Sequence, residues 1–217
     1  EVDNNKMAPL SVGGAQQTPL FSPDGNMIAY VRDNNIFLVK LLYDNAESQV
    51  TKDGERNKII NGIPDWVYEE EFSTNRSMVF SADSRQLVWI KYDESAVKEY
   101  SFQWFRGSNP SLDDYLAYPG SYVYKYPKAG EDNSKVAVYS FDIKSRQTRK
   151  MDIPLDADGY IPRIAMTADP TKVAVFTMNR HQDDMRIYMV NPLTTIAKLA
   201  VQDKVEKYVK QEAMCAV

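Results

Sequence analysis

Residues 21–30 read Phe21-Ser22-Pro23-Asp24-Gly25-Asn26-Met27-Ile28-Ala29-Tyr30: an apolar strand end, a turn around an aspartate and a second apolar run. The same pattern returns at residues 80–89 and 166–175. The turn aspartates of the three copies are Asp24, Asp83 and Asp169. An aspartate side chain accepts hydrogen bonds from the backbone N–H groups of its own turn, so the pattern is typical of two strands joined by a tight turn. The repeat therefore predicts three related strand–turn–strand units.

Further strands are expected around these units. Residues 35–39 and 185–190 are rich in apolar side chains, and Val136–Ile143 with Thr148–Ile153 predicts a hairpin over residues 144–147. The 14 Tyr, 8 Phe and 3 Trp residues also favour strands over helices. We therefore predict an all-β fold, a partial β-propeller of about three to four antiparallel four-stranded blades, with a β-sandwich as the structural alternative.

The spacing of the repeats indicates two long insertions. The repeats start 59 and 86 residues apart, wider than the roughly 40–50 residues of an ordinary propeller blade. The first insertion holds Asn61–Phe72, and the second spans about Tyr92–Asn133. The second contains the tyrosines Tyr115, Tyr118, Tyr122, Tyr124 and Tyr126. Long loops in compact domains are commonly functional. Outside the insertions, we expect a helix only near Val201–Ala213.

Charge and residue counts exclude several kinds of function. The net charge of −4 argues against a general nucleic-acid binder, and no stretch approaches the roughly 18 apolar residues of a membrane span. Cys215 and His181 are the single cysteine and histidine, which excludes an internal disulfide, a cysteine-based zinc site and a two-histidine metal site. We expect Cys215 to be buried and His181 to be structural.

Catalytic motifs are also missing from the sequence. It has no Gly-x-Ser-x-Gly elbow and no phosphate-binding glycine loop. We therefore expect no catalytic residue, no metal site and no cofactor in this chain.

One segment of the first insertion stands apart because three adjacent carboxylates, Glu69, Glu70 and Glu71, follow Trp66 and Tyr68. One interpretation is an acidic, solvated surface turn, the common location of a short charge run. The other is a site in which two carboxylates converge on a cation. On a strand Glu69 and Glu71 would share a face, and on a helix all three would fan over one side. A calcium site would lack the usual spaced Asp/Asn/Gly pattern.

The acidic segment also carries a resemblance to a known family. Asp65-Trp66-Val67-Tyr68-Glu69-Glu70-Glu71 resembles the double-glutamate motif of the dipeptidyl peptidase IV family. The resemblance continues, in the order of the family, through Tyr92-Asp93-Glu94-Ser95, Glu99-Tyr100-Ser101-Phe102, Tyr126-Pro127-Lys128-Ala129-Gly130, Asn179-Arg180-His181-Gln182 and Tyr188-Met189-Val190-Asn191-Pro192. It covers nearly the whole chain and is strongest toward bacterial members.

The resemblance implies an eight-bladed propeller that caps an α/β-hydrolase domain. Residues 1–217 would be a single incomplete domain, the early-to-middle blades of that propeller, and both ends of the chain look cut. The hydrolase domain with its catalytic serine, aspartate and histidine would lie outside the chain, so the chain alone is expected to be inactive. An arginine that helps bind substrate in family members has no counterpart that we find here.

Residue by residue, the amine-binding pair of the family falls on Glu70 and Glu71, and Glu69 carries no role. These two residues, on a short helical insertion, are expected to anchor the free N-terminal amine of a peptide from which X-Pro or X-Ala dipeptides are released. The Tyr92–Asn133 insertion corresponds to an extended arm that contributes to homodimer contacts in the family. Its tyrosines would alternatively cover a blade edge of their own chain. Export to the periplasm or cell surface is implied in the same way.

Two functions of different classes follow. The first is the substrate-recognition part of a serine exopeptidase that binds peptides with a free N-terminus and acts together with its own hydrolase domain. The second is a non-catalytic propeller scaffold for protein–protein interaction. A glycan- or metal-binding propeller has only the acidic run in its support.

Overall fold

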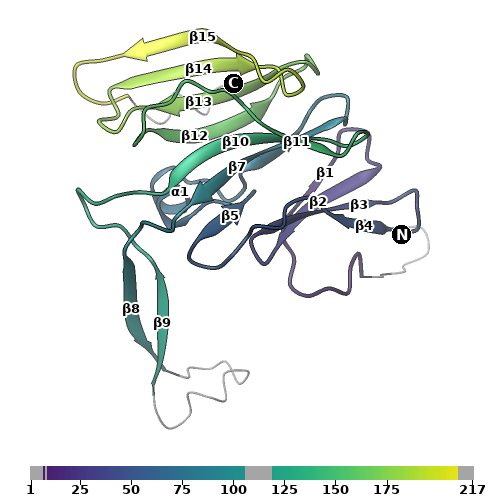
Figure 1. The fold of residues 1–217 in the computed structure, drawn as a ribbon, viewed down its shortest axis with the longest axis horizontal. Coiled ribbons are helices and arrows are strands. Elements are labelled where there is room, and N and C mark those ends of the chain that lie inside the picture. Colours follow the sequence, from purple (N-terminus) through teal and green to yellow (C-terminus); the bar gives the residue numbers. More distant parts are fainter. Residues whose placement is uncertain (1–6, 8, 106–118, 210–217) are drawn as a thin grey trace.

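The computed structural model describes residues 7, 9–105 and 119–209, and it is built almost wholly of strands (Figure 1). Three antiparallel sheets follow one another across the molecule, and a two-stranded hairpin projects from the middle one. The all-β prediction is confirmed. Three successive sheets agree with a partial propeller rather than with the two-layer sandwich.

The first sheet has the strand order β1-β2-β3-β4. Its strands are β1 (Gln17–Phe21), β2 (Met27–Arg32), β3 (Asn35–Lys40) and β4 (Ala46–Gln49). The central pair, β2 and β3, is in register from Met27 opposite Lys40 to Arg32 opposite Asn35. Almost all side chains of this pair are buried, since apolar clusters form on both faces of the two strands.

The middle sheet is built around β7, one edge of which is shared by two short strands. Its strands are β5 (Ile59–Asn61), β6 (Met78–Phe80), β7 (Gln86–Asp93), β10 (Lys135–Asp142) and β11 (Gln147–Lys150). β10 pairs with one edge of β7 along its whole length. β5 pairs with one half of the other edge and β6 with the other half. The helix α1 (Trp66–Glu71) lies in the chain between these two short strands. The predicted hairpin over residues 144–147 is the β10–β11 pair.

The third sheet has the order β12-β13-β14-β15. Its strands are β12 (Tyr160–Met166), β13 (Val173–Met178), β14 (Asp184–Val190) and β15 (Ala197–Lys204). β13 is buried along its whole length and lies inside the sheet, between β12 and β14.

The helix expected near Val201–Ala213 is wrong for the part of the segment that the structure describes. β15 extends to Lys204 and pairs with β14, and residues 205–209 contain no helix. Val201 lies opposite Ile187 and Leu199 opposite Tyr188, with a β-bulge between them. As a strand, this segment forms backbone hydrogen bonds with the edge of β14. A short isolated helix would have no such stabilising contact. Residues 210–213 and Cys215 lie outside the described residues.

The second insertion forms an arm. Its strands β8 (Glu99–Trp104) and β9 (Gly120–Lys125) pair only with each other and extend away from the sheets (Figure 1). The predicted extended arm is confirmed for these residues, whereas Tyr115 and Tyr118 fall outside the described part of the chain. The arm joins β7 to β10, which pair with each other, so the insertion does not interrupt the middle sheet.

The three repeated turns have the expected aspartate caps. Asp24 Oδ1 accepts a hydrogen bond from Asn26 N at 3.1 Å, Asp83 Oδ1 one from Arg85 N at 3.2 Å, and Asp169 Oδ1 one from Thr171 N at 2.9 Å. Hydrogen bonds to the carboxylate, from Ser22 Oγ first, lower the pKa of Asp24. The pKa of Asp169 is lowered by Lys172 and Thr171. The capped turn is therefore a structural element of each sheet.

Two apolar layers hold the sheets together. One lies between the first and middle sheets, and its most buried members include Val31, Leu38, Leu87 and Trp89. The larger layer lies between the middle and third sheets and includes α1. Each of these two layers is made from the faces of two sheets, and a small third cluster of Tyr30, Phe37 and Val39 covers the other face of the first sheet.

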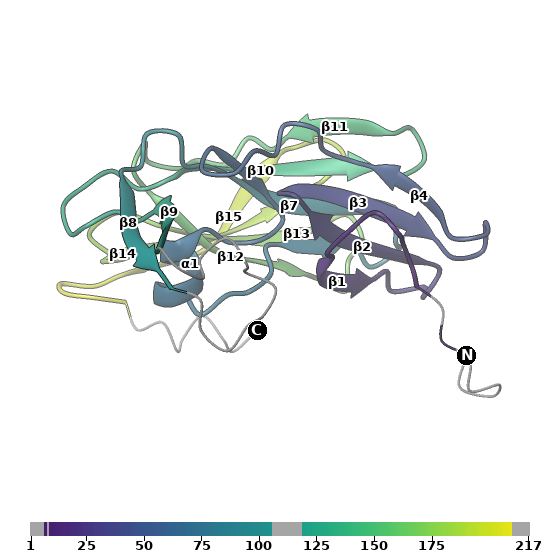
Figure 2. The ribbon, with the colours of Figure 1, turned by 90° about the horizontal axis from the view of Figure 1, so that it is seen from below.

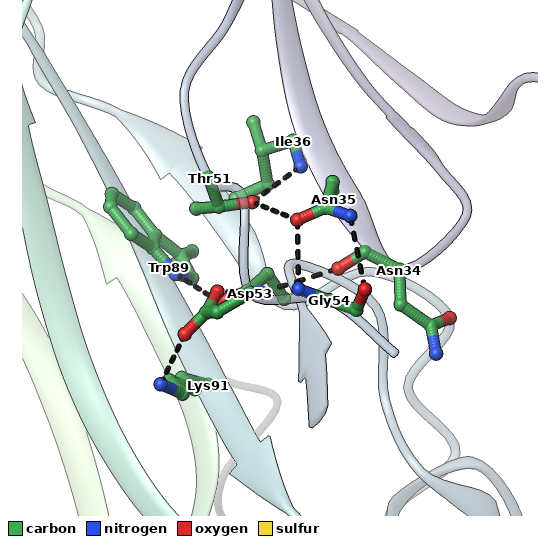
Figure 3. A network of polar contacts seen from close by, with 9 residues as sticks. Asn34, Asn35, Ile36, Thr51, Asp53, Gly54, Trp89 and Lys91 are labelled. Carbon is green, nitrogen blue, oxygen red and sulfur yellow. Dashed lines mark hydrogen bonds and ion pairs between the residues drawn. The ribbon is translucent and has the colours of Figure 1, made fainter. Parts of the chain in front are cut away.

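A polar network, partly buried, joins the first sheet to the middle one (Figure 3). Asn61, 1% exposed, donates through Nδ2 to Asn34 O at 3.2 Å and to Asp53 Oδ1 at 3.0 Å, and its Oδ1 accepts Trp89 Nε1–H at 3.1 Å. Lys91 pairs with the other oxygen of Asp53. This side-chain amide thus satisfies groups on both sheets at the end of β5, where the chain leaves for α1.

We expect Asn61→Ala to lower the free energy of unfolding by about 1–3 kcal/mol, because the indole N–H of Trp89 loses its partner in a buried place. Urea denaturation followed by tryptophan fluorescence measures this change. Asn75→Ala is the control, since Asn75 is exposed and its side chain has no hydrogen bond within the described residues. Equal stability of the two variants would contradict the role of Asn61.

Candidate functional site

The helix α1 begins at a residue suited to start it. Asp65 has extended backbone angles, φ −79° and ψ 178°, and its Oδ1 accepts the N–H of Tyr68 at 3.0 Å. This is the N-cap arrangement, in which a side chain replaces the missing partner of a first-turn N–H group. Glu69 lies in the first turn, where a negative charge interacts favourably with the helix dipole. The prediction of a short helical insertion that carries the glutamates is confirmed.

The loop that carries α1 leaves and rejoins β7 at one point. Gly62 N donates to Ile90 O at 3.1 Å, Ile90 N donates to Ser77 O at 2.9 Å, and Ser77 N donates to Gly62 O at 2.9 Å. Gly62 has a positive φ of 80°, and a side chain there would approach Ile36 to 3.0 Å. The hydrogen bonds along β7 therefore continue from β5 to β6 without a gap, and residues 63–76 form a closed excursion from the sheet.

One side of α1 is buried and fixed to distant parts of the chain. Asp65 Oδ2 accepts the hydroxyl of Ser134, and the hydroxyl of Tyr68 accepts the N–H of Ile161 at 3.0 Å. At the rim, the Trp66 ring packs on Tyr126 at the base of the arm, with ring centroids 4.1 Å apart. Figures 1 and 2 show α1 and the base of the arm at the same end of the molecule.

The opposite side of α1 presents its carboxylates to solvent. Glu69, Glu70 and Glu71 are all exposed. Within the described residues, none of these side chains forms a hydrogen bond or an ion pair. The structure therefore supports the surface placement of the acidic run and leaves its carboxylates available to a cation. Among the described residues, no three His, Cys, Asp or Glu side chains are arranged to hold a metal ion.

A cavity of about 570 Å³ lies beside α1, and Glu71 is in its wall, whereas Glu70 is not. The wall also contains aromatic side chains of Trp66, Phe72, Tyr126 and Tyr160 and the cationic side chains of Lys128 and Arg180. Arg180 donates to Glu131 O at 2.7 Å, and its guanidinium lies 5.9 Å from the centre of the Tyr160 ring. The site thus combines carboxylate, aromatic and cationic groups from four separate stretches of the chain.

Reasoning from the sequence missed the position of Arg180 in this wall, although its motif was part of the resemblance. The residue comes from the turn between β13 and β14, more than a hundred positions from α1, so only the packing of the third sheet on the middle one brings them together. His181, its neighbour, is exposed in the same turn. No helix of the described residues has the length and apolarity needed to cross a membrane.

Two buried carboxyl groups lie beneath the site. Burial raises the pKa of Asp65, against the hydrogen bonds from Ser134, Tyr68 and Val67. Burial, followed by repulsion from Asp65, raises the pKa of Glu94 to about 7, and Lys125 opposes this shift. Glu94 is 6% exposed. Its protonation state is therefore sensitive to pH near neutrality.

Comparisons with known proteins place these features in a family. The model of the family described as the dipeptidyl peptidase IV (DPP IV) N-terminal region matches residues 1–217. The chain is similar to the crystal structure of Porphyromonas gingivalis dipeptidyl peptidase 4, with a TM-score of 0.89 and 45% identity over 96% of this chain and 28% of that one. A putative dipeptidyl aminopeptidase IV from Bacteroides ovatus shares the fold, with a TM-score of 0.73 and 21% identity over 91% of this chain and 25% of that one.

A curated relative is the probable dipeptidyl-aminopeptidase B of Emericella nidulans, 36% identical over 205 residues. The match covers 90% of this chain and 22% of that protein. A second, of the same description, comes from Aspergillus oryzae and is 34% identical over 86% of this chain and 21% of its own length. The chain thus spans only about a fifth of the curated relatives that it matches.

We expect Glu94→Gln to stabilise the protein more at pH 8 than at pH 4.5. The folded-state pKa of Glu94, about 7, lies above its ordinary value of 4.5. The folded protein therefore binds the proton more tightly, and the free energy of unfolding falls as pH rises from about 4.5 to about 7, by up to about 3 kcal/mol. Glutamine removes this titration. The measurement is the difference in Tm between variant and wild type at the two pH values.

The matched control is Glu69→Gln, which makes the same substitution at an exposed position. The Tm difference of Glu94→Gln from the wild type is expected to change more between the two pH values than that of this surface variant. A Glu94→Gln difference that is equally flat would show that the buried carboxyl does not titrate in this range.

Proposed function

The chain belongs to the family of dipeptidyl peptidase IV N-terminal regions, and from this we propose that it is the substrate-recognition part of a serine exopeptidase of the dipeptidyl peptidase IV type. The peptidase releases X-Pro and X-Ala dipeptides, and Glu70 with Glu71 anchors the free N-terminal amine of the peptide. The observation that carries the proposal is that both carboxylates are exposed and unpaired on a helix whose opposite side is fixed to two distant segments.

The chemistry of a peptide N-terminus suits such a pair. An α-ammonium group has three N–H donors, and two carboxylates accept more of them than one does. A charge pair 4 Å apart gains about 4 kcal/mol at an effective dielectric constant near 20, before desolvation is subtracted. A peptide with an acetylated N-terminus lacks this charge and would leave both carboxylates without their partner.

An anchor for the amine also sets where the peptide is cut. With its first residue held at α1, the bound peptide extends a fixed distance toward the nucleophile. Only the bond after the second residue then meets it, so dipeptides are released. The nucleophile and its partners would come from the hydrolase domain of the whole protein, and the chain alone is expected to hydrolyse nothing. Export to the periplasm or cell surface remains a prediction from the family resemblance.

We further propose that the arm forms a homodimer contact. Tyr100 lies opposite Tyr124 and Phe102 opposite Tyr122, so these side chains share one face of the hairpin. Tyr100, Phe102 and Tyr122 are 44%, 38% and 42% exposed. The other face carries mainly polar residues, among them Ser101 and Gln103. A contiguous exposed aromatic face is typical of a protein interface.

We expect Glu70→Gln and Glu71→Gln in the full-length protein each to lower kcat/KM for Gly-Pro-p-nitroanilide by about 100-fold or more, because each removes a charge partner of the substrate amine in a partly desolvated site. Steady-state kinetics with equal amounts of folded enzyme measure this. Glu69→Gln, on the same helix, is the control and is expected to keep nearly normal kcat/KM.

Near-normal turnover in both Glu70→Gln and Glu71→Gln would refute the amine anchor. Absence of activity in the folded wild-type protein would favour the alternative function, a propeller scaffold for protein interaction.

For the arm, we expect Phe102→Asp to shift the full-length protein from dimer to monomer in sedimentation velocity, because a carboxylate would be desolvated in an aromatic contact. Ser101→Asp places the same charge on the polar face and should leave the dimer intact. A Phe102→Asp protein that sediments as the wild type does would exclude the aromatic face from the dimer contact.

A further inference from the structure

The strand β12 has an irregularity directly beside α1. Tyr160 pairs with Met178 and Arg163 with Phe176, so three steps along β12 correspond to two along β13. One residue is therefore extra on β12, as in a β-bulge. Pro162 has no N–H group, and the N–H of Ile161 is directed out of the sheet. Bulges of this kind redirect groups next to functional sites.

The freed N–H group of Ile161 has its partner on α1. It donates to the hydroxyl of Tyr68 at 3.0 Å, across 93 positions of sequence. Tyr68 is 1% exposed, and its ring packs against Tyr92, Phe72 and Tyr160, with centroids 4.8, 5.1 and 6.2 Å away. The ring contacts are apolar and allow small rotations, whereas the hydrogen bond requires one direction of the hydroxyl.

The orientation of α1 depends on such anchors because the helix has only six residues. A helix of this length has no stability of its own in water. Its anchors are the Tyr68 hydroxyl on the third sheet and the Asp65 carboxylate on Ser134, three positions apart on the buried side. Glu70 and Glu71 lie on the exposed side. Any rotation of α1 about its axis moves both carboxylates together.

We propose that Tyr68 is a positioning residue for the amine anchor: its hydroxyl, bound to the N–H freed by the β12 bulge, holds α1 in the rotation in which Glu70 and Glu71 meet the substrate ammonium. The proposal rests on the proposed function of these two glutamates. Without the hydroxyl, α1 samples other rotations. The apparent affinity for substrate is then reduced in proportion to the fraction of molecules in which α1 has the binding-competent rotation.

The test is Tyr68→Phe in the full-length protein, which keeps the ring and removes only the hydroxyl. We expect KM for Gly-Pro-p-nitroanilide to rise roughly tenfold and kcat to change less than about twofold. We also expect faster amide hydrogen exchange at Ile161. Ser134→Ala, which releases the other anchor, is expected to raise KM in the same way and serves as the second variant if Tyr68→Phe fails to fold.

Tyr30→Phe is the matched control. Tyr30 is fully buried in the first sheet and its hydroxyl donates to Glu47, far from α1. We expect its KM to stay at the wild-type value.

Three results would overturn the proposal or its premise. An unchanged KM in both anchor variants, with Glu71→Gln still impaired, would refute the positioning role and leave the amine anchor standing. A fall in kcat and Tm with unchanged KM would show that Tyr68 only stabilises the fold. An unchanged KM in Glu70→Gln and Glu71→Gln as well would refute the proposed function itself.

Discussion

The rest of the structure depends on how the backbone groups along one edge of β7 are hydrogen-bonded. A buried strand edge has to satisfy its backbone N–H and C=O groups, and here two short strands share that task. The chain can leave the sheet between them only because Gly62 and Ser77 both bond to Ile90 and to each other. The place of α1 follows directly: a helix inserted at this gap projects from the sheet edge while both ends of its loop stay fixed. The buried amide of Asn61 then ties the start of that loop to the first sheet.

Much of the fold could be predicted from local pattern. The aspartate turns recur because in each the carboxylate accepts a backbone N–H of its own turn. The arm was detectable as the excess length between the second and third repeats. The division of one edge strand into β5 and β6 could not be predicted from the sequence, since each part is only three residues long. The helix expected after residue 200 was wrong because strand pairing with β14 outweighed a ragged apolar pattern.

For the site, the glutamates could be identified from the sequence and their surroundings could not. Ser134, Ile161 and Arg180 reach α1 from 69 to more than a hundred positions away, through contacts that exist only after the sheets pack. The same packing sets two carboxyl groups of raised pKa, Asp65 and Glu94, under a helix with three exposed carboxylates. A raised pKa favours the neutral form of both buried groups, whereas the three glutamates of the helix face solvent.

The closed excursion between Gly62 and Ser77 has an evolutionary consequence. Its two ends bond to each other and to Ile90, so the hydrogen bonds along β7 do not depend on the residues between them. Asp65 and Tyr68, within the excursion, are nevertheless bound to Ser134 and Ile161. Sequence change is therefore tolerated best at the exposed positions of the excursion, because its buried positions are part of the packing of the third sheet on the middle one.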